Sequence, residues 1–341
     1  MVKGAIQMIY LKDDRLVFKF PEIHPDAEMS ICFQRTMRIP DDGGTYPLPP
    51  GLGAFPIRHV DDFSKNLPSK WVERGGVMIP MYQSEALWIS FNGSYISERY
   101  FFAVKISTGK ISAITGKGWK KGLNSKPQDY AVIPDQPWLD GYCVEKGIIR
   151  QFVAMPLGAG YTAEEQITGL AEHGGLQIEV FPMKRKVYED LMSKRKKQMS
   201  EDRHVLYCAP GPDMGLAPGG KMRQEIYEDK YGLDAWDTSV SSRCFIHIVN
   251  SLAWRMITGD NPPTTPLTSK EYAASGLPWF DYYGGDLKAL DGAKELKNLK
   301  SIMEKAEEKG DKPLPENESV SYDRVIKLGV TEKGQVREGE F

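Results

Sequence analysis

Cysteine and histidine are sparse in this chain, and neither forms a recognisable site. The 341 residues include four cysteines that lie far apart without a C-x-x-C pair, and five histidines without H-x-H, H-E-x-x-H or Cys/His spacing. A chain of this length buries enough surface to fold without disulfides or a structural metal. We therefore interpret the cysteines as reduced, buried thiols and expect no metal site. Because no G-x-G-x-x-G motif precedes a helix, we also expect no cofactor.

No excess of one charge is present, which excludes a globally basic nucleic-acid binder. The chain has 44 Lys and Arg against 46 Asp and Glu, for a net charge of −2. The seven basic residues between Lys184 and Lys197 would surround a helix axis instead of lining one face. We interpret this segment as a solvated helix or exposed linker that marks a domain boundary near residue 200. We expect no nucleic-acid partner.

Long apolar runs are also absent. No window approaches the roughly eighteen apolar residues of a membrane-spanning helix. The segment after Met1 lacks the apolar core and small-residue cleavage site of a signal peptide. We expect a cytoplasmic protein without membrane contact.

The chain does contain many short segments with a period of two, separated by turn residues. In the clearest example, Leu176, Ile178 and Val180 alternate with Gln177 and Glu179. Further strands are expected at 5–11, 15–20, 29–34, 76–82, 86–91, 100–106, 110–115, 128–133, 148–155 and 325–330. The pattern predicts a β-rich α+β fold: an antiparallel β-sandwich or barrel-like core with a few peripheral helices and an extended C-terminal arm. The Pro/Gly-rich stretch 40–56 is expected to form neither a β-ladder nor a helix, and to be an ordered loop or extended segment.

Helices are few but carry clear signals. Capping boxes begin short helices at Thr162 and Thr268, and a longer helix is expected from about Asp286 to Lys309. We divide the chain into a β-rich core domain (1–200), a loop-and-helix region packed on it (201–310) and an extended arm (311–341).

One glycine motif matches the start of a phosphate-binding loop. Gly215, Gly220 and Lys221 fit the first seven positions of G-x-x-x-x-G-K-[ST]. Met222 stands where the magnesium-binding hydroxyl belongs, and Pro218 removes a backbone amide. Phosphate or nucleotide binding is therefore one hypothesis for 215–221, and a structural Gly/Pro loop is the alternative.

A six-residue pattern, P-W-φ-D-x-Y, occurs twice in the chain. Flat aromatic faces beside a carboxylate suit a carbohydrate, a cation or a partner surface. The alternative is structural, with proline turning the chain, tryptophan filling the core and aspartate capping a turn. The candidate ligand-binding residues are Trp138, Asp140 and Tyr142 in the first copy and Trp279, Asp281 and Tyr283 in the second.

Carboxylates and aromatics are concentrated directly after the glycine motif. If the chain is a hydrolase or carbohydrate-active enzyme, the 213–237 segment is the place to expect its acid and base. A surface loop with an aromatic cluster is the alternative. The candidate catalytic residues are Glu225, Glu228, Asp229 and Asp234.

The leading hypothesis from the sequence is a cytosolic binding or assembly protein. Catalytic signatures such as G-x-S-x-G are absent, aromatics make up 11% of the chain, and both ends look extended. We expect homo-oligomers formed through the aromatic loops and the C-terminal arm, with a small polar or carbohydrate ligand as a further partner. The hydrolase and the phosphate-binding protein are the alternatives.

Overall fold

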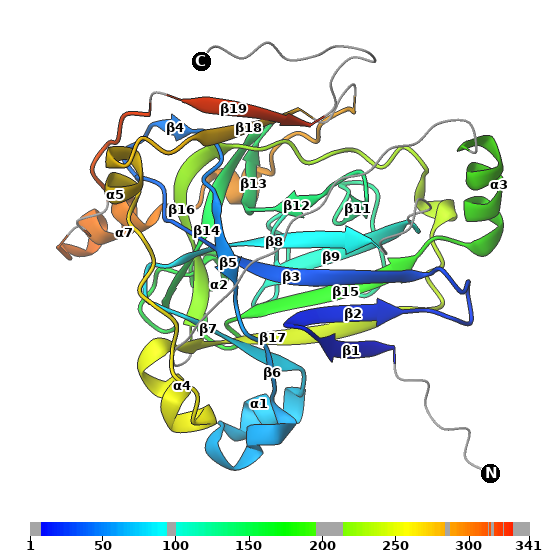
Figure 1. The fold of residues 1–341 in the computed structure, drawn as a ribbon, viewed down its shortest axis with the longest axis horizontal. Helices are drawn as coiled ribbons and strands as arrows, with labels where there is room; N and C mark the ends of the chain where they lie inside the picture. Colours follow the sequence, from blue (N-terminus) through cyan, green and yellow to red (C-terminus); the bar gives the residue numbers. More distant parts are fainter. Residues whose placement is uncertain are drawn as a thin grey trace.

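A computed structural model describes residues 8–93, 100–195, 214–283, 287–312, 314, 317–322 and 324–329. It contains a 17-stranded, mainly antiparallel sheet and several short helices (Figure 1). The predicted β-rich α+β class is therefore confirmed. None of the described helices is long and apolar enough to cross a membrane.

The sheet consists of two ladders. In the first ladder the strands follow the order β1 (Ile9–Lys12), β2 (Arg15–Lys19), β3 (Glu28–Thr36), β8 (Ala86–Gly93), β14 (Ile148–Pro156) and β16 (Met214–Arg223). Four shorter strands pair at its margins: β4 (Thr45–Tyr46), β5 (Gly51–Ala54), β12 (Trp138–Leu139) and β13 (Gly141–Glu145). The second runs β6 (Arg58–His59), β7 (Val77–Met81), β17 (Ser242–Asn250), β15 (Leu176–Pro182) and β9 (Phe102–Thr108), and ends in β10 (Ile111–Ser112) and β11 (Ala131–Ile133). Among the described residues, a single pair, Met214 with Ile248, joins the two ladders.

Period-two alternation explains why these segments form strands. On β8, Leu87, Ile89 and Phe91 are buried, whereas Trp88 and Ser90 between them are partly exposed. A hairpin joins β1 and β2, because Asp13 and Asp14 adopt φ values of 50° and 52°, which suit a two-residue turn.

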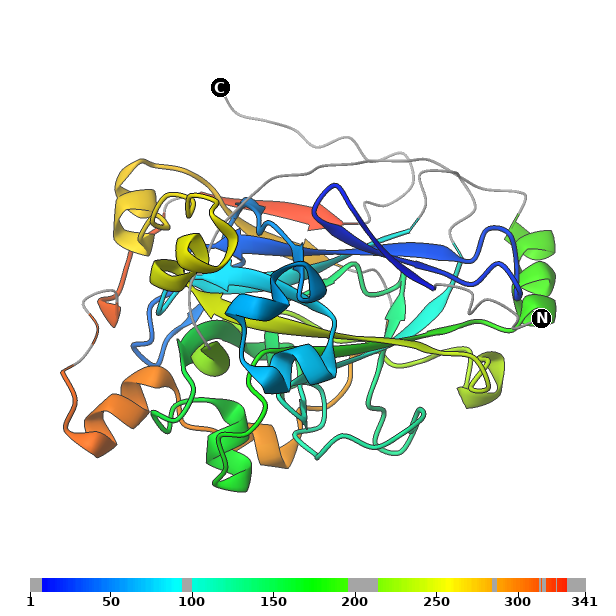
Figure 2. The same cartoon turned by 90° about the horizontal axis from the view of Figure 1, so that it is seen from below.

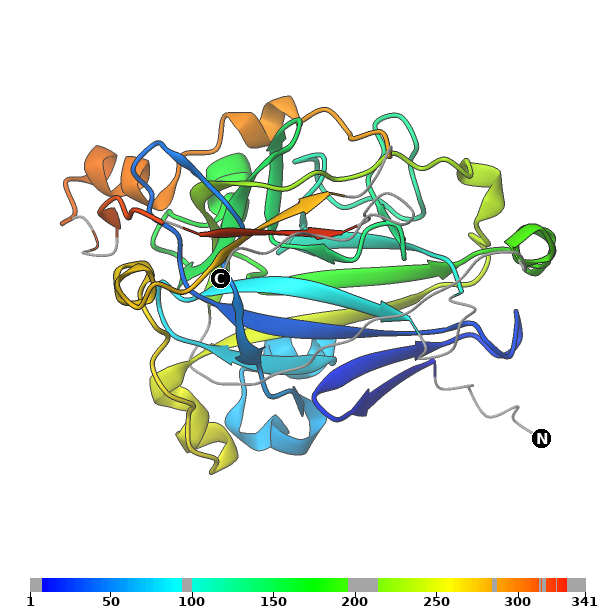
Figure 3. The ribbon, with the colours of Figure 1, turned by 45° about the horizontal axis from the view of Figure 1, so that its top comes forward.

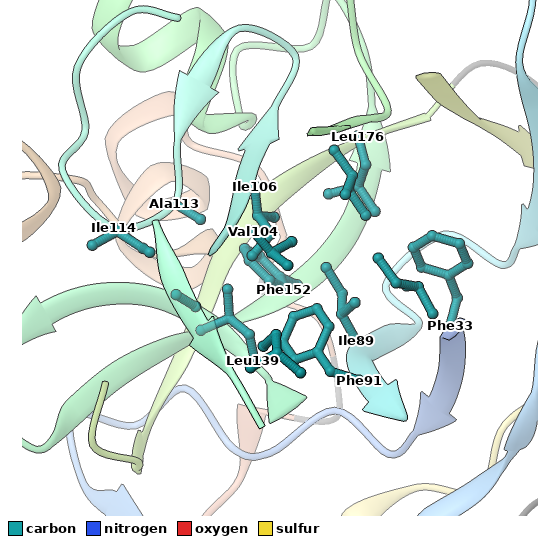
Figure 4. Close-up of a cluster of buried hydrophobic side chains, with 14 of the residues drawn as sticks. Phe33, Ile89, Phe91, Val104, Ile106, Ala113, Ile114, Leu139, Phe152 and Leu176 are labelled. Atoms are coloured by element: carbon teal, nitrogen blue, oxygen red, sulfur yellow. The ribbon is translucent and has the colours of Figure 1, made fainter. Parts of the chain in front are cut away.

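The main core lies where side chains of the two ladders meet. Figure 4 shows Ile89 and Phe152 of the first ladder close to Val104 and Ile106 of the second, with Phe33 at one end of the same cluster. Strands before and after residue 200 contribute to this one cluster, because Leu216 on β16 and Ile246 on β17 belong to it. Region 201–310 thus supplies strands as well as loops and helices.

Short helices lie around the sheet, most of them at its ends and margins (Figure 1). They are η1 (Asp61–Asn66), α1 (Ser69–Arg74), α2 (Ala163–Thr168), α3 (Arg185–Arg195), η2 (Leu233–Ala235), α4 (Ser251–Thr258), α5 (Ser269–Ala274), α6 (Lys294–Lys297) and α7 (Ile302–Lys309). Both predicted capping boxes are confirmed, at the starts of α2 and α5. The basic helix α3 and helix α7 lie at opposite ends of the molecule (Figure 1, Figure 2).

Three local expectations differ from the structure. The single helix expected over 286–309 is wrong for its described part, because Ser301 caps a new helix and divides the segment into α6 and α7. The stretch 40–56 contains the short strands β4 and β5. The Gly/Pro loop expected at 215–221 is part of β16.

The described part of the C-terminal arm packs on its own chain. Strand β18 (Trp279–Tyr283) pairs in parallel with β19 (Val325–Gly329), and the two strands lie side by side in Figure 3. Before β19, the ring of Tyr322 lies 5.6 Å from that of Trp279, between ring centroids.

Candidate functional site

Two glycines in β16 allow another backbone segment to approach the strand closely. A Cβ atom on Gly220 would overlap the carbonyl oxygen of Pro40, and one on Gly219 would lie 2.6 Å from Val153 Cγ2. The chain before β4 therefore crosses β16 at Gly220. This crossing brings Asp41 to the strand.

The same glycines form no phosphate cradle. Their segment is extended, and residues 215–218 pair with β14 in the ladder, so consecutive amides do not converge on one point. Gly215 has a packing role, because a Cβ there would lie 2.7 Å from Thr162 Cγ2 at the start of α2. Lys221, by contrast, lines a cavity.

Arg150 and Lys221 lie directly opposite each other in the β14–β16 ladder. Opposed residues project from the same face of a sheet, so these two cationic side chains are neighbours. Like charges in this arrangement repel, and the site must supply compensating anions.

Two carboxylates compensate Arg150. Asp41 Oδ1 lies 3.8 Å from Arg150 Nη1, and Glu304 Oε2 lies 3.0 Å from Arg150 Nη2. Asp41 Oδ2 also accepts the Met303 N–H at 2.8 Å, and Glu304 Oε2 accepts the Ser301 N–H at 2.5 Å. Helix α7 is thus fixed to the sheet through the same groups that surround Arg150.

A cavity of about 280 Å³ opens beside this cluster. We call it the α7 cleft. Its lining residues are Asp41, Asp42, Gly43, Arg150, Lys221, Ser301, Met303, Glu304 and Glu307. Arg150 and Asp41 are buried at its base, whereas the Glu304 side chain is 51% exposed.

The two carboxyl groups titrate in opposite directions. Burial raises the pKa of Asp41 above its ordinary value, and this outweighs the Met303 N–H and the charge of Arg150. Partial burial acts in the same sense on Glu304, but the Ser301 N–H and the charges of Arg150 and Lys221 outweigh it, so the pKa of Glu304 is lowered. The cleft therefore holds one carboxyl that favours its proton and one that favours ionisation.

The first copy of the P-W-φ-D-x-Y pattern is mostly buried. Asp140 and Gln224 bond reciprocally, with Gln224 Nε2 donating to Asp140 Oδ2 at 2.5 Å and the Asp140 N–H donating to Gln224 Oε1 at 3.0 Å. Burial raises the pKa of Asp140 to about 7. The Tyr142 hydroxyl donates to the Leu216 carbonyl inside the core, while Trp138 is half-buried.

The second copy contacts the first. The rings of Trp138 and Tyr282 lie 4.6 Å apart in an edge-to-face arrangement, and Trp279 is fully buried. Asp281 forms a two-pronged pair with Arg223 at 2.9 and 3.2 Å. Tyr283 ends β18, and its side chain lies outside the described residues. The described aromatics of both copies thus contact other parts of the same chain.

The four carboxylates predicted after the glycine motif have separate surroundings. Asp229 accepts bonds from the Tyr130 hydroxyl at 2.6 Å and from Trp236 Nε1 at 2.8 Å, which suits a structural role. Glu228 pairs with Lys288, and Glu225 and Asp234 are exposed. None of the four lines the α7 cleft.

Sequence reasoning missed Asp41, Arg150 and Glu304. One local signal was available for Glu304, because Ser301 and Glu304 form a capping box of the kind found at Thr162 and Thr268. The meeting of Asp41 with Arg150 depends on the crossing at Gly220, which no short-range pattern shows. Among the described residues, no group of three or more His, Cys, Asp or Glu side chains is placed to hold a metal ion.

No protein-family model, curated protein or solved structure matches this chain.

Proposed function

We propose that the chain is a hydrolase that acts on a small polar substrate in the α7 cleft. In this proposal Asp41 is the general acid and Glu304 the general base. The observation that carries it is a pair of carboxyl groups on one guanidinium whose pKa values are shifted in opposite directions. Such a division between neighbouring carboxyl groups is how acid and base roles are assigned in hydrolytic sites.

The distances are compatible with this chemistry. Because the two carboxylate oxygens contact the two Nη atoms of one planar guanidinium, they are at most about 9 Å apart. Carboxyl pairs that hydrolyse glycosidic bonds are separated by about 5 to 9.5 Å, with the longer separations leaving room for an attacking water. The half-exposed Glu304 is suited to activate such a water, and the buried Asp41 to protonate a leaving group.

The size and lining of the cleft favour a small molecule with several polar groups. A volume of about 280 Å³ is near the lower end for ligand sites. Carboxylates and two cations offer acceptors and donors within one cavity. Hydroxyl groups can both donate and accept hydrogen bonds, so a substrate of sugar-ring size fits this lining.

The experiment is an assay of the full chain on a panel of 4-nitrophenyl glycosides, esters and phosphates. We expect turnover on at least one class, and a loss of kcat of about 100-fold or more in both Asp41→Asn and Glu304→Gln. Turnover on none of the classes, or turnover that neither substitution changes, would contradict the proposal.

The matched control is Glu308→Gln. Glu308 is on the same helix, exposed and paired with Lys300 and Lys305, and it does not line the cleft. We expect its kcat to equal that of the natural chain. Because Asp41 and Glu304 also hold α7, circular dichroism and thermal unfolding of each variant separate a chemical loss from loss of the fold.

Self-association is a second proposal, favoured by edge strands. Within the described residues, β1 pairs with β2 alone and β19 with β18 alone, and Leu328 on β19 is exposed. An unpaired strand edge can add a strand from a second copy. Light scattering should give a dimer or larger mass for the full chain and a monomer for Leu328→Lys; a monomeric natural chain would refute this proposal.

A further inference from the structure

We propose that Lys221, together with Arg150, forms an anion-binding subsite in the α7 cleft, so that the ligand carries a phosphate or carboxylate group. The inference rests on the proposed function only where it treats the bound anion as part of a substrate. Anion binding itself can be measured without hydrolysis.

The first observation is that the two cations have different partners. Arg150 contacts both Asp41 and Glu304. Within the part of the chain that the structure describes, no ion pair or hydrogen bond engages the Lys221 ammonium, although the residue is half-buried and lines the cleft. A half-buried ammonium gains most from an anionic partner, since burial weakens its hydration and strengthens the attraction.

The second observation is the ladder register. Lys221 is directly opposite Arg150, so the ammonium and the guanidinium project from the same face of β14 and β16. Two like charges at opposed positions destabilise a sheet. If Lys221 had only a structural role, its charge would be expected to stabilise the strands around it. An anion between or beside the two groups would turn their repulsion into a shared attraction.

The third observation concerns Asp42, one of the four carboxylates that line the cleft. Asp42 Oδ2 accepts bonds from the Tyr46 and Ser319 hydroxyls at 2.6 Å each, and Asp42 Oδ1 accepts the Gly44 N–H. Asp42 is thus engaged by its own loop and by Ser319. Of the two cations that line the cleft, Lys221 has the fewer partners in the described structure: its charge acts on Glu304, but no ion pair or hydrogen bond engages its ammonium.

The test measures anion binding by calorimetry and by amide chemical shifts in the full chain. Inorganic phosphate is the first probe, and acetate or citrate is the second. Comparing them distinguishes a phosphate site from a carboxylate site. We expect one of these probes to bind with a Kd in the millimolar range or below, and Lys221→Met to weaken it at least tenfold. Lys221→Arg, which keeps the charge, should retain most of the binding.

Lys305→Met is the matched control. Lys305 is on α7 but outside the cleft, and its ammonium is paired with Glu308 at 2.7 Å. We expect this variant to bind the anion as the natural chain does. We also expect the Tm of Lys221→Met to stay close to that of the natural chain, because the substitution removes both the repulsion from Arg150 and the attraction to Glu304.

Three results would each overturn the inference. The natural chain could bind neither probe, Lys221→Met could bind the anion as tightly as the natural chain, or the Tm of Lys221→Met could clearly fall while its anion affinity is unchanged. Failure of the hydrolase proposal gives a different result: anions bind through Lys221, but no substrate is turned over. Anion binding that survives in Asp41→Asn, while hydrolysis is lost, would support both proposals.

Discussion

The Asp140→Asn variant is expected to gain about 4 kcal/mol of stability relative to the natural chain as the pH rises from about 4 to about 7. Burial raises the pKa of Asp140 from 3.8 to about 7, whereas the unfolded chain keeps the ordinary value. Between these values the unfolded chain releases its proton and the folded chain holds it. The natural chain therefore loses stability with rising pH in this window, and asparagine removes that loss.

The measurement is urea unfolding of both chains at half-unit steps from pH 4 to pH 8. Asp281→Asn is the control, because it removes the matching carboxylate of the second P-W-φ-D-x-Y copy, in an exposed pair with Arg223. We expect less than about 1 kcal/mol from the control at any pH. A constant difference between Asp140→Asn and the natural chain would show that Asp140 is not a desolvated carboxyl group.

The second large effect is expected from Gly220→Ala. The added methyl would overlap the Pro40 carbonyl, so the strand or the crossing segment must move. Overpacking typically costs about 1 to 3 kcal/mol, and we expect about 3 kcal/mol here because the obstacle is backbone and not the end of a flexible side chain. Because the crossing places Asp41, we also expect hydrolysis to fall together with stability.

Gly118→Ala is the control for this substitution. Nothing lies within 4 Å of a Cβ built at Gly118. We expect a change in the free energy of unfolding within about 0.5 kcal/mol. If chemical unfolding gave the two variants equal stability, the close approach at Gly220 would be wrong.

Local patterns predicted most of the fold because they reflect local physics. The alternation of Leu176, Ile178 and Val180 identifies β15, because every second side chain of a strand points to the same face, although Gln177 and Glu179 between them are buried as well. The capping boxes at Thr162 and Thr268 identify helix starts for the same reason: their hydrogen bonds span three residues.

The error at 286–309 also has a local cause. Leu296, Leu299 and Ile302 are buried at helical spacing, but Asn298–Lys300 departs from the helix and Ser301 caps the next one. Periodicity records which side chains are buried, and two short helices in succession can bury the same set as one long helix.

The candidate site could not be predicted in this way, because it depends on long-range contacts. Asp41, Arg150 and Glu304 are brought together from a loop, a strand and a helix that are far apart in the sequence. Lys221 was recognised through a glycine motif, yet the glycines beside it serve close packing instead of phosphate binding. The sequence therefore indicated one residue of the cleft, through a loop that does not form.

The most direct test of the acid–base pair is a carbon-13 NMR titration of the Asp41 and Glu304 carboxyl groups in the full chain. The α7 cleft predicts that Asp41 titrates above its ordinary pKa of 3.8 and Glu304 below its ordinary pKa of 4.5. Asparagine and glutamine variants assign the two signals. If Asp41 instead titrated at or below 3.8, the cleft would hold no carboxyl that retains a proton for the leaving group, and the proposed acid would be wrong.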